Sequence, residues 1–127
     1  MDDTDRERLI AGWICLVHTN KATAEYDARF WAYKDLEHIR ETDPLACLEI
    51  VVAIMDRDPS DNDVISNLAA GPVEEMLVGQ GGAIIGQIEQ LATANPAFKR
   101  LLGGVWDSHI PEPIKTQFNR IRGAERW

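Results

Sequence analysis

The fold is decided by one segment of the chain, Asp43-Pro-Leu-Ala-Cys-Leu-Glu-Ile-Val-Val-Ala-Ile-Met-Asp56. Asp43 followed by Pro44 is a helix start signal, because aspartate caps a first turn and proline suits the first helical position. The run Ile50-Val-Val52 is also compatible with a strand. The length of the segment, its proline start and the lack of a partner strand elsewhere favour a buried helix from Pro44 to about Asp56.

Helical spacing continues toward the N-terminus. Thr4 is the expected cap of a first helix, with Glu7 completing a capping box. Thr23 is the expected cap of a second helix that continues toward Ile39. The first helix carries an apolar stripe of the spacing that a half-buried helix shows, formed by Leu9, Ile10, Trp13, Ile14 and Val17.

Toward the C-terminus, glycine and proline residues interrupt the helical pattern. Asp58-Pro-Ser60 breaks the chain, and the next apolar stripe ends at Gly71-Pro72. Pro72 is expected to begin a short helix through Val78, followed by a loop at Gly79–Gly82 and a helix in which Gly86 marks a close crossing. Asn95-Pro96 repeats the cap-then-proline signal. Pro111 and Pro113 introduce the last helix, whose apolar face is Ile114, Phe118 and Ile121.

These segments predict an all-α protein, a compact bundle of about seven short helices. The 127 residues form a single domain, 1–127, with residues 1–3 and 123–127 frayed. The stretch from Pro44 to Leu77 resembles the helix pairs of HEAT-type arrays, with an apolar helix, an acidic turn and a second helix. The bundle is therefore expected to have some helical-hairpin character.

Charge is distributed unevenly along the chain. The net charge is −8, but residues 1–75 hold 7 basic and 17 acidic side chains, whereas residues 76–127 hold 6 and 4. Such a front half repels nucleic acid and anionic lipid, so neither is an expected partner. The acidic start and the lack of a long apolar run predict a cytoplasmic protein. Cys15 and Cys47 lie in apolar patterns and are expected to be reduced and buried.

A search for chemistry yields no catalytic, cofactor-binding or metal-binding residues. Asp56, Asp58 and Ser60 have calcium-loop spacing, but Asp61 and Asn67 replace the turn glycine and the closing glutamate. The same acidic residues are explained by the helix that follows, because carboxylates are favourable at a helix N-terminus. The three histidines are His18, His38 and His109, and none has a zinc partner at helical spacing.

Two other features bear on function. The side chains of Glu74 and Glu75 diverge on a helix, which argues against an acid/base pair. Their position in the first turn is better explained by favourable interaction of carboxylates with the helix dipole. Trp106 follows two glycines, so it either closes the bottom of the core, the preferred interpretation, or stands on the surface as a partner anchor.

One resemblance covers most of the chain. Leu68-Ala-Ala-Gly-Pro-Val-Glu-Glu-Met-Leu77, Asn95-Pro-Ala-Phe98 and Leu101-Leu-Gly-Gly-Val-Trp106 resemble the A-G-P-L-E-D-L-L, D-P-x-F and L-L-G-G-V-W motifs of a family of small bacterial proteins, a domain of unknown function. The resemblance implies an all-helical bacterial protein and brings no catalytic residues. The chain departs from the first motif at Val73, where the family usually has leucine, and at Glu75, where it usually has aspartate. Both replacements are conservative.

The resulting hypothesis is a non-enzymatic protein that binds another protein, in its sharpest form an acidic immunity protein that neutralises a basic toxin domain. The expected partner surface comprises Asp56, Asp58, Asp61, Asp63 and Trp106. The alternative is a cytosolic helical scaffold or regulatory protein that self-associates as a homodimer. An enzyme would need a site assembled in space, with polar groups converging from among Glu25, His38, Glu74, Glu75 and His109.

Overall fold

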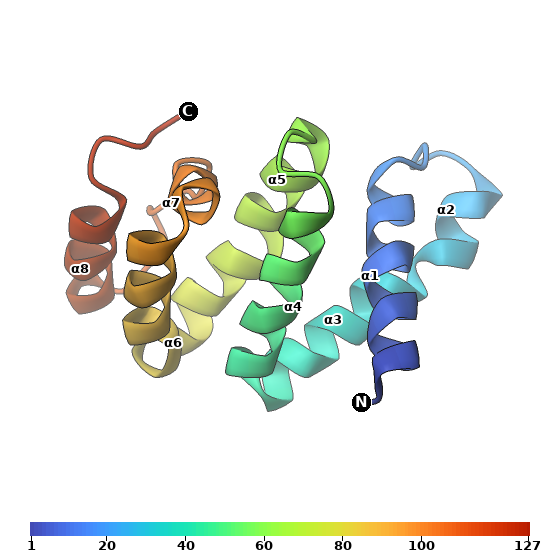
Figure 1. Cartoon of the computed structure of the whole chain (residues 1–127), viewed down its shortest axis with the longest axis horizontal. Helices are drawn as coiled ribbons and strands as arrows, with labels where there is room; N and C mark the ends of the chain where they lie inside the picture. Colours follow the sequence, from blue (N-terminus) through green and yellow to red (C-terminus); the bar gives the residue numbers. More distant parts are fainter.

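The computed structural model describes residues 1–127 as a chain of helices without strands. The predicted all-α class is confirmed. Figure 1 shows that the helices follow one another along the long axis, from α1 and α2 at one end to α7 and α8 at the other. They are α1 (Asp3–Val17), α2 (Ala24–Arg29), α3 (Trp31–Thr42), α4 (Pro44–Arg57), α5 (Asn62–Leu68), the π-helical turn η1 (Ala69–Val73), α6 (Glu74–Ala94), α7 (Pro96–Leu102) and α8 (Glu112–Arg122).

Neighbouring helices in the sequence are also neighbours in space. α3 contacts α4, α4 contacts α5, and α6 contacts α7. Contacts also reach one helix further, from α1 to α3, from α4 to α6 and from α6 to α8. Only Phe30 separates α2 from α3, and α5 runs through η1 into α6 without a gap. The chain therefore contains six continuous helical segments rather than the seven predicted, and they succeed one another as in a helical array (Figure 1).

The decisive segment is a helix, as predicted. Asp43 caps α4, its carboxylate accepting a hydrogen bond from the Ala46 backbone N–H at 3.1 Å. Val51, Ile54 and Met55 are completely buried. They belong to a single hydrophobic cluster to which α1 and α3 to α8 all contribute. Burial of apolar surface is the main favourable term in folding. The buried side chains of α4 therefore contribute strongly to the stability of the array.

The prediction that one helix ends at Gly71-Pro72 and another begins there is wrong. The chain stays helical there and widens into η1, in which the Glu74 N–H bonds to the Ala69 carbonyl five residues earlier. Proline has no N–H and its ring crowds the preceding turn, which is why proline usually ends or kinks a helix. The wider turn accommodates the ring without ending the helix, so α5 and α6 remain one path.

The predicted loop at Gly79–Gly82 is also wrong. These residues lie inside α6, which is kinked where Gln80 takes a non-helical conformation (φ −140°, ψ 25°). A Cβ on Gly81 would lie only 2.7 Å from Ile114 Cγ2 of α8, whereas a Cβ on Gly86 would meet nothing within 4 Å. The close helix crossing is therefore at Gly81 and not at Gly86.

Three further local predictions can be compared with the structure. The Thr4 cap is wrong, because Asp2 caps α1 by accepting a hydrogen bond from the Asp5 N–H at 2.8 Å. The Thr23 cap is confirmed, with its hydroxyl accepting from the Tyr26 N–H. The Asn95 cap of α7 is confirmed as well.

The two cysteines differ in their surroundings. Cys47 is buried in α4, and burial raises the pKa of its thiol to about 12. Cys15 is exposed on α1, contrary to the prediction that both are buried, and both thiols are free. The apolar stripe of α1 faces the core through Leu9, Ile10 and Trp13, which leaves Cys15 on the outer side.

Candidate functional site

The predicted acidic surface lies on the end of α4, the following loop and the start of α5. Asp58 accepts hydrogen bonds from the N–H (3.0 Å) and hydroxyl (2.5 Å) of Ser60. Asp61 caps α5 by accepting from the Val64 N–H at 3.2 Å. The helix-start role of Asp61 is thereby confirmed. Asp56, Asp58 and Asp63 are all exposed.

The aspartates of this surface lie in different surroundings. Asp56 borders a hollow of about 420 Å³ between α1 and α4, together with Asp3, Glu7 and Arg57. Glu7 and Arg57 form an ion pair across it. Asp61 and Asp63 instead face the end of α1. The acidic surface is therefore continuous with the acidic first turns of α1 on one side and meets a histidine on the other.

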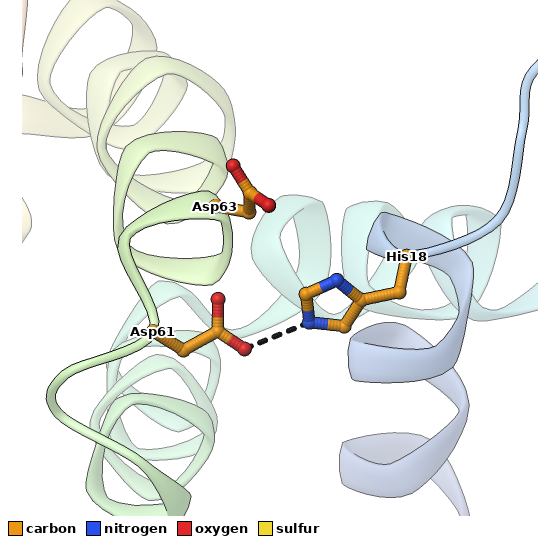
Figure 2. A group of neighbouring side chains, drawn as sticks. All are labelled: His18, Asp61 and Asp63. Carbon is orange, nitrogen blue, oxygen red and sulfur yellow. Dashed lines mark hydrogen bonds and ion pairs between the residues drawn. The ribbon is translucent and has the colours of Figure 1, made fainter.

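That histidine is His18, the residue that follows α1. Figure 2 shows its ring extending toward the start of α5, where Asp61 and Asp63 lie. His18 Nε2 is 2.7 Å from Asp61 Oδ2, with the side chains 44% and 21% exposed. One ligand atom from each of His18, Asp61 and Asp63 lies within 4.8 Å of the other two. Three groups of the kind that bind metal ions therefore converge between α1 and α5.

The electrostatics of this cluster are set mainly by hydrogen bonds to Asp61. Its pKa lies below the usual range, first because the Val64 N–H donates to its carboxylate and then because His18 does so. Asp63 has no hydrogen-bond or ion-pair partner for its carboxylate. Two carboxylates and an imidazole are thus held in one place.

Sequence reasoning missed this cluster. His18 and Asp61 are 43 residues apart, and the search for histidine partners covered only helical spacing. The contact exists because α1 packs beside α5. No local signal in the sequence indicates that packing.

A second polar cluster joins α3 to the start of α6. Glu75 accepts a hydrogen bond from the Tyr33 hydroxyl at 3.4 Å, and its other oxygen lies 3.3 Å from Arg40 Nε. The Arg40 N–H is not aligned for a hydrogen bond, so this contact is an ion pair only. Burial raises the pKa of Glu75 against the opposing effect of Arg40, and burial together with Glu75 raises the pKa of Tyr33. The Gln80 amide donates to the Arg40 carbonyl at 2.9 Å, which ties the kink of α6 to the end of α3.

The space at this second cluster is small. The hollow beside Tyr33, Glu37, Arg40 and Glu75 has a volume of about 10 Å³, room for about one water molecule. Of the acid and base candidates that the sequence offered, only Glu75 lines it. Glu74 instead accepts a hydrogen bond from the Trp106 N–H at 3.2 Å, and the others, Glu25, His38 and His109, are exposed elsewhere.

Trp106 is on the surface, with 74% of its side chain exposed, so the preferred prediction that it closes the core is wrong. Val105 and Ile110 take that place and are almost fully buried. Trp127 packs nearby over Gly103 and donates from its indole to the Arg100 carbonyl at 2.7 Å. Trp106 and Trp127 together border one hollow of about 280 Å³.

Comparison with known proteins identifies the family. The chain belongs to a family of unknown function, DUF6869, whose model matches residues 19–125. The predicted membership of a family without an assigned activity is confirmed. No curated protein and no solved structure matches the chain. No helix combines the length and the apolar character needed to cross a bilayer.

Proposed function

We propose that this member of a family without an assigned activity binds a basic protein partner through the acidic surface of its N-terminal half and catalyses no reaction. The observation that carries the proposal is uncompensated charge. Of the 17 acidic side chains in residues 1–75, only Glu7, Glu41, Asp61 and Glu75 lie within 4.0 Å of a basic group. The other thirteen have no ion-pair partner within the chain.

Such a surface favours a specific kind of partner. Uncompensated carboxylates create a negative local potential of several kT, which speeds association with a basic protein and repels acidic ones. The C-terminal half, with 6 basic and 4 acidic side chains, has no comparable excess. The proposal therefore places the partner on α1, α4 and the loop before α5 rather than on α7 and α8.

The sharper form of the proposal is a bacterial immunity protein that binds and neutralises a basic toxin domain. Small size, a helical fold and an acidic surface suit that role, since rapid, charge-steered binding protects a cell from its own toxin. The proposed location is the cytoplasm, where the free thiols of Cys15 and Cys47 are stable in reduced form.

The test replaces Asp56, Asp58, Asp61 and Asp63 together by asparagine. Asparagine caps helices as well as aspartate does, so the loop and the start of α5 are retained while four charges are removed. The probe is the protein encoded directly upstream of the gene, where that protein is basic. Because exposed charge pairs contribute about 0.2–1 kcal/mol each, the loss of four is expected to weaken binding by at least about fourfold, with a shallower dependence on salt.

A matched control replaces Glu89, Glu112 and Glu125 by glutamine in the C-terminal half, where we expect almost no change in affinity. Because the control removes three charges and the test variant four, equal losses per charge removed would show that only net charge matters. An unchanged affinity and salt dependence in the four-aspartate variant would exclude this surface as the binding site.

The alternative is self-association through exposed apolar groups. Leu45 is 46% exposed and borders a hollow of about 340 Å³ between α4 and α6, and Trp106 is 74% exposed at the other end of the array. Light scattering coupled to size exclusion distinguishes the two proposals. A dimer that Leu45→Ser or Trp106→Ser dissociates would favour the scaffold, whereas a monomer favours the acidic surface.

A further inference from the structure

We propose that His18, Asp61 and Asp63 form a binding site for a divalent transition-metal ion, with Zn²⁺ the preferred one, between the end of α1 and the start of α5. The proposal is independent of the partner-binding function and rests on the geometry of Figure 2. An imidazole nitrogen and carboxylate oxygens are ligand types that Zn²⁺ accepts, and three protein ligands would leave a fourth position open for water.

The donor atoms are available for a metal. His18 Nε2 and Asp61 Oδ2 bond only to each other, because the hydrogen bond that caps α5 uses Asp61 Oδ1. The Asp63 carboxylate is exposed and makes no ion pair. A metal ion would therefore replace one hydrogen bond while leaving the cap of α5 in place.

The rearrangement needed is small. Metal–ligand distances of about 2.0–2.1 Å put neighbouring donors of a tetrahedral site about 3.3 Å apart. The His18 and Asp61 donors are now 2.7 Å apart, and Asp63 lies within 4.8 Å of both. Opening the first pair by about half an ångström and turning the exposed Asp63 side chain inward would complete the three protein ligands.

The local charge also favours a dication. Two carboxylates and an uncharged imidazole carry a charge of −2, and no lysine or arginine forms an ion pair with either aspartate. The end of α1 adds a partial negative charge at His18, which offsets the partial positive charge that the start of α5 adds at Asp61. A divalent ion would therefore neutralise the two carboxylates, while the opposite partial charges of the two helix ends nearly cancel.

Occupation of the site would join segments 43 residues apart. A ligand that binds only the folded chain raises its stability, and here the added stability would act on the contact between α1 and α5. The free site already has the His18–Asp61 hydrogen bond in that position, so the metal would reinforce an existing contact rather than create one.

The experiment measures Zn²⁺ binding to the metal-free full chain by calorimetry, with Co²⁺ absorption as a second readout of the ligand geometry. Every sample carries Cys15→Ser, because the exposed Cys15 thiol is itself a zinc ligand. We expect one equivalent to bind, the thermal midpoint to rise, and His18→Gln and Asp63→Asn each to weaken binding by at least tenfold.

The matched control is His38→Gln, which removes an exposed histidine on α3 and should leave binding unchanged. Circular dichroism of each variant checks that it is folded, and Asp63→Asn provides a change that breaks no contact within the chain. Absence of saturation at millimolar Zn²⁺, or binding that survives both His18→Gln and Asp63→Asn, would overturn the proposal. A loss of binding in His38→Gln equal to that in His18→Gln would also overturn it.

Discussion

Arg122→Ala is expected to be the most destabilising single change outside the apolar core. Arg122 is the only charged residue that is buried, with 2% of its surface exposed. Its guanidinium donates to the Val105 carbonyl at 2.8 Å, to Asn119 Oδ1 at 2.6 Å and to Asp107 Oδ2 at 3.2 Å. It thereby joins the end of α8 to the loop after α7.

The magnitude follows from what remains after truncation. The Val105 carbonyl loses its partner inside the protein, which costs about 1–3 kcal/mol. Loss of the Asn119 hydrogen bond and of packing over the Phe118 ring, 4.8 Å from the guanidinium, adds about 1–2 kcal/mol. Asp107 is 30% exposed, so its ion pair is screened and adds less than about 1 kcal/mol. The expected loss is about 3 kcal/mol.

The assay is urea unfolding of both chains, followed by circular dichroism. We expect the midpoint to fall while the slope of free energy against urea is unchanged, because the surface exposed on unfolding is nearly the same. Arg126→Ala is the control, since Arg126 is exposed on the same terminal segment and its loss should cost less than about 0.5 kcal/mol. A loss below about 1 kcal/mol for Arg122→Ala would refute the reasoning that these hydrogen bonds hold the loop.

Four further substitutions test other contacts. Gly81→Ala should cost about 1–3 kcal/mol because its Cβ would lie 2.7 Å from Ile114 Cγ2, whereas Gly86→Ala, with nothing within 4 Å, should stabilise by about 0.5–1 kcal/mol in thermal unfolding. Asn95→Ala should cost about 1–2 kcal/mol in urea unfolding, since the Asn95 side chain accepts from two N–H groups at the start of α7. The raised pKa of Glu75 means that the folded chain binds its proton more tightly than the unfolded chain, so its contribution to stability is present at low pH and lost as pH rises through the folded pKa. Glu75→Gln should remove that component, and the stability of the wild type relative to the variant should decrease from pH 4 to pH 7; a difference independent of pH would contradict it.

The helices were largely predictable from the sequence because their signals are local. Asp43-Pro44 and Asn95-Pro96 act within one turn of their own helices, and the apolar stripes repeat at helical spacing whatever the helix packs against. The predictions failed at Pro72 and Gln80, where local rules indicate a break. There the surrounding core keeps the helix continuous, with Val73, Met76 and Leu77 all completely buried.

The candidate site was only half predictable, for a related reason. The aspartates before α5 are marked by helix-start chemistry, so their position on a loop follows from the sequence. Their pairing with His18 and the burial of Arg122 depend on which helices pack together, and several packings share the same apolar stripes. Trp106 shows the same limit, because Val105 beside it is equally apolar and the structure buries that residue instead.

The metal site and the partner surface share Asp61 and Asp63, so the two proposals together make a prediction that neither makes alone. A bound dication would cancel two negative charges of the acidic surface, and coupling between two ligands is reciprocal. Zn²⁺ should therefore weaken binding of the basic partner, and the partner should weaken binding of Zn²⁺ by the same factor. The decisive control is His18→Gln, which removes a metal ligand and leaves all four aspartates in place. This variant should bind the partner as the wild type does without zinc and should lose the response to zinc. A response that persists in His18→Gln would show that zinc acts on the partner or elsewhere on the chain.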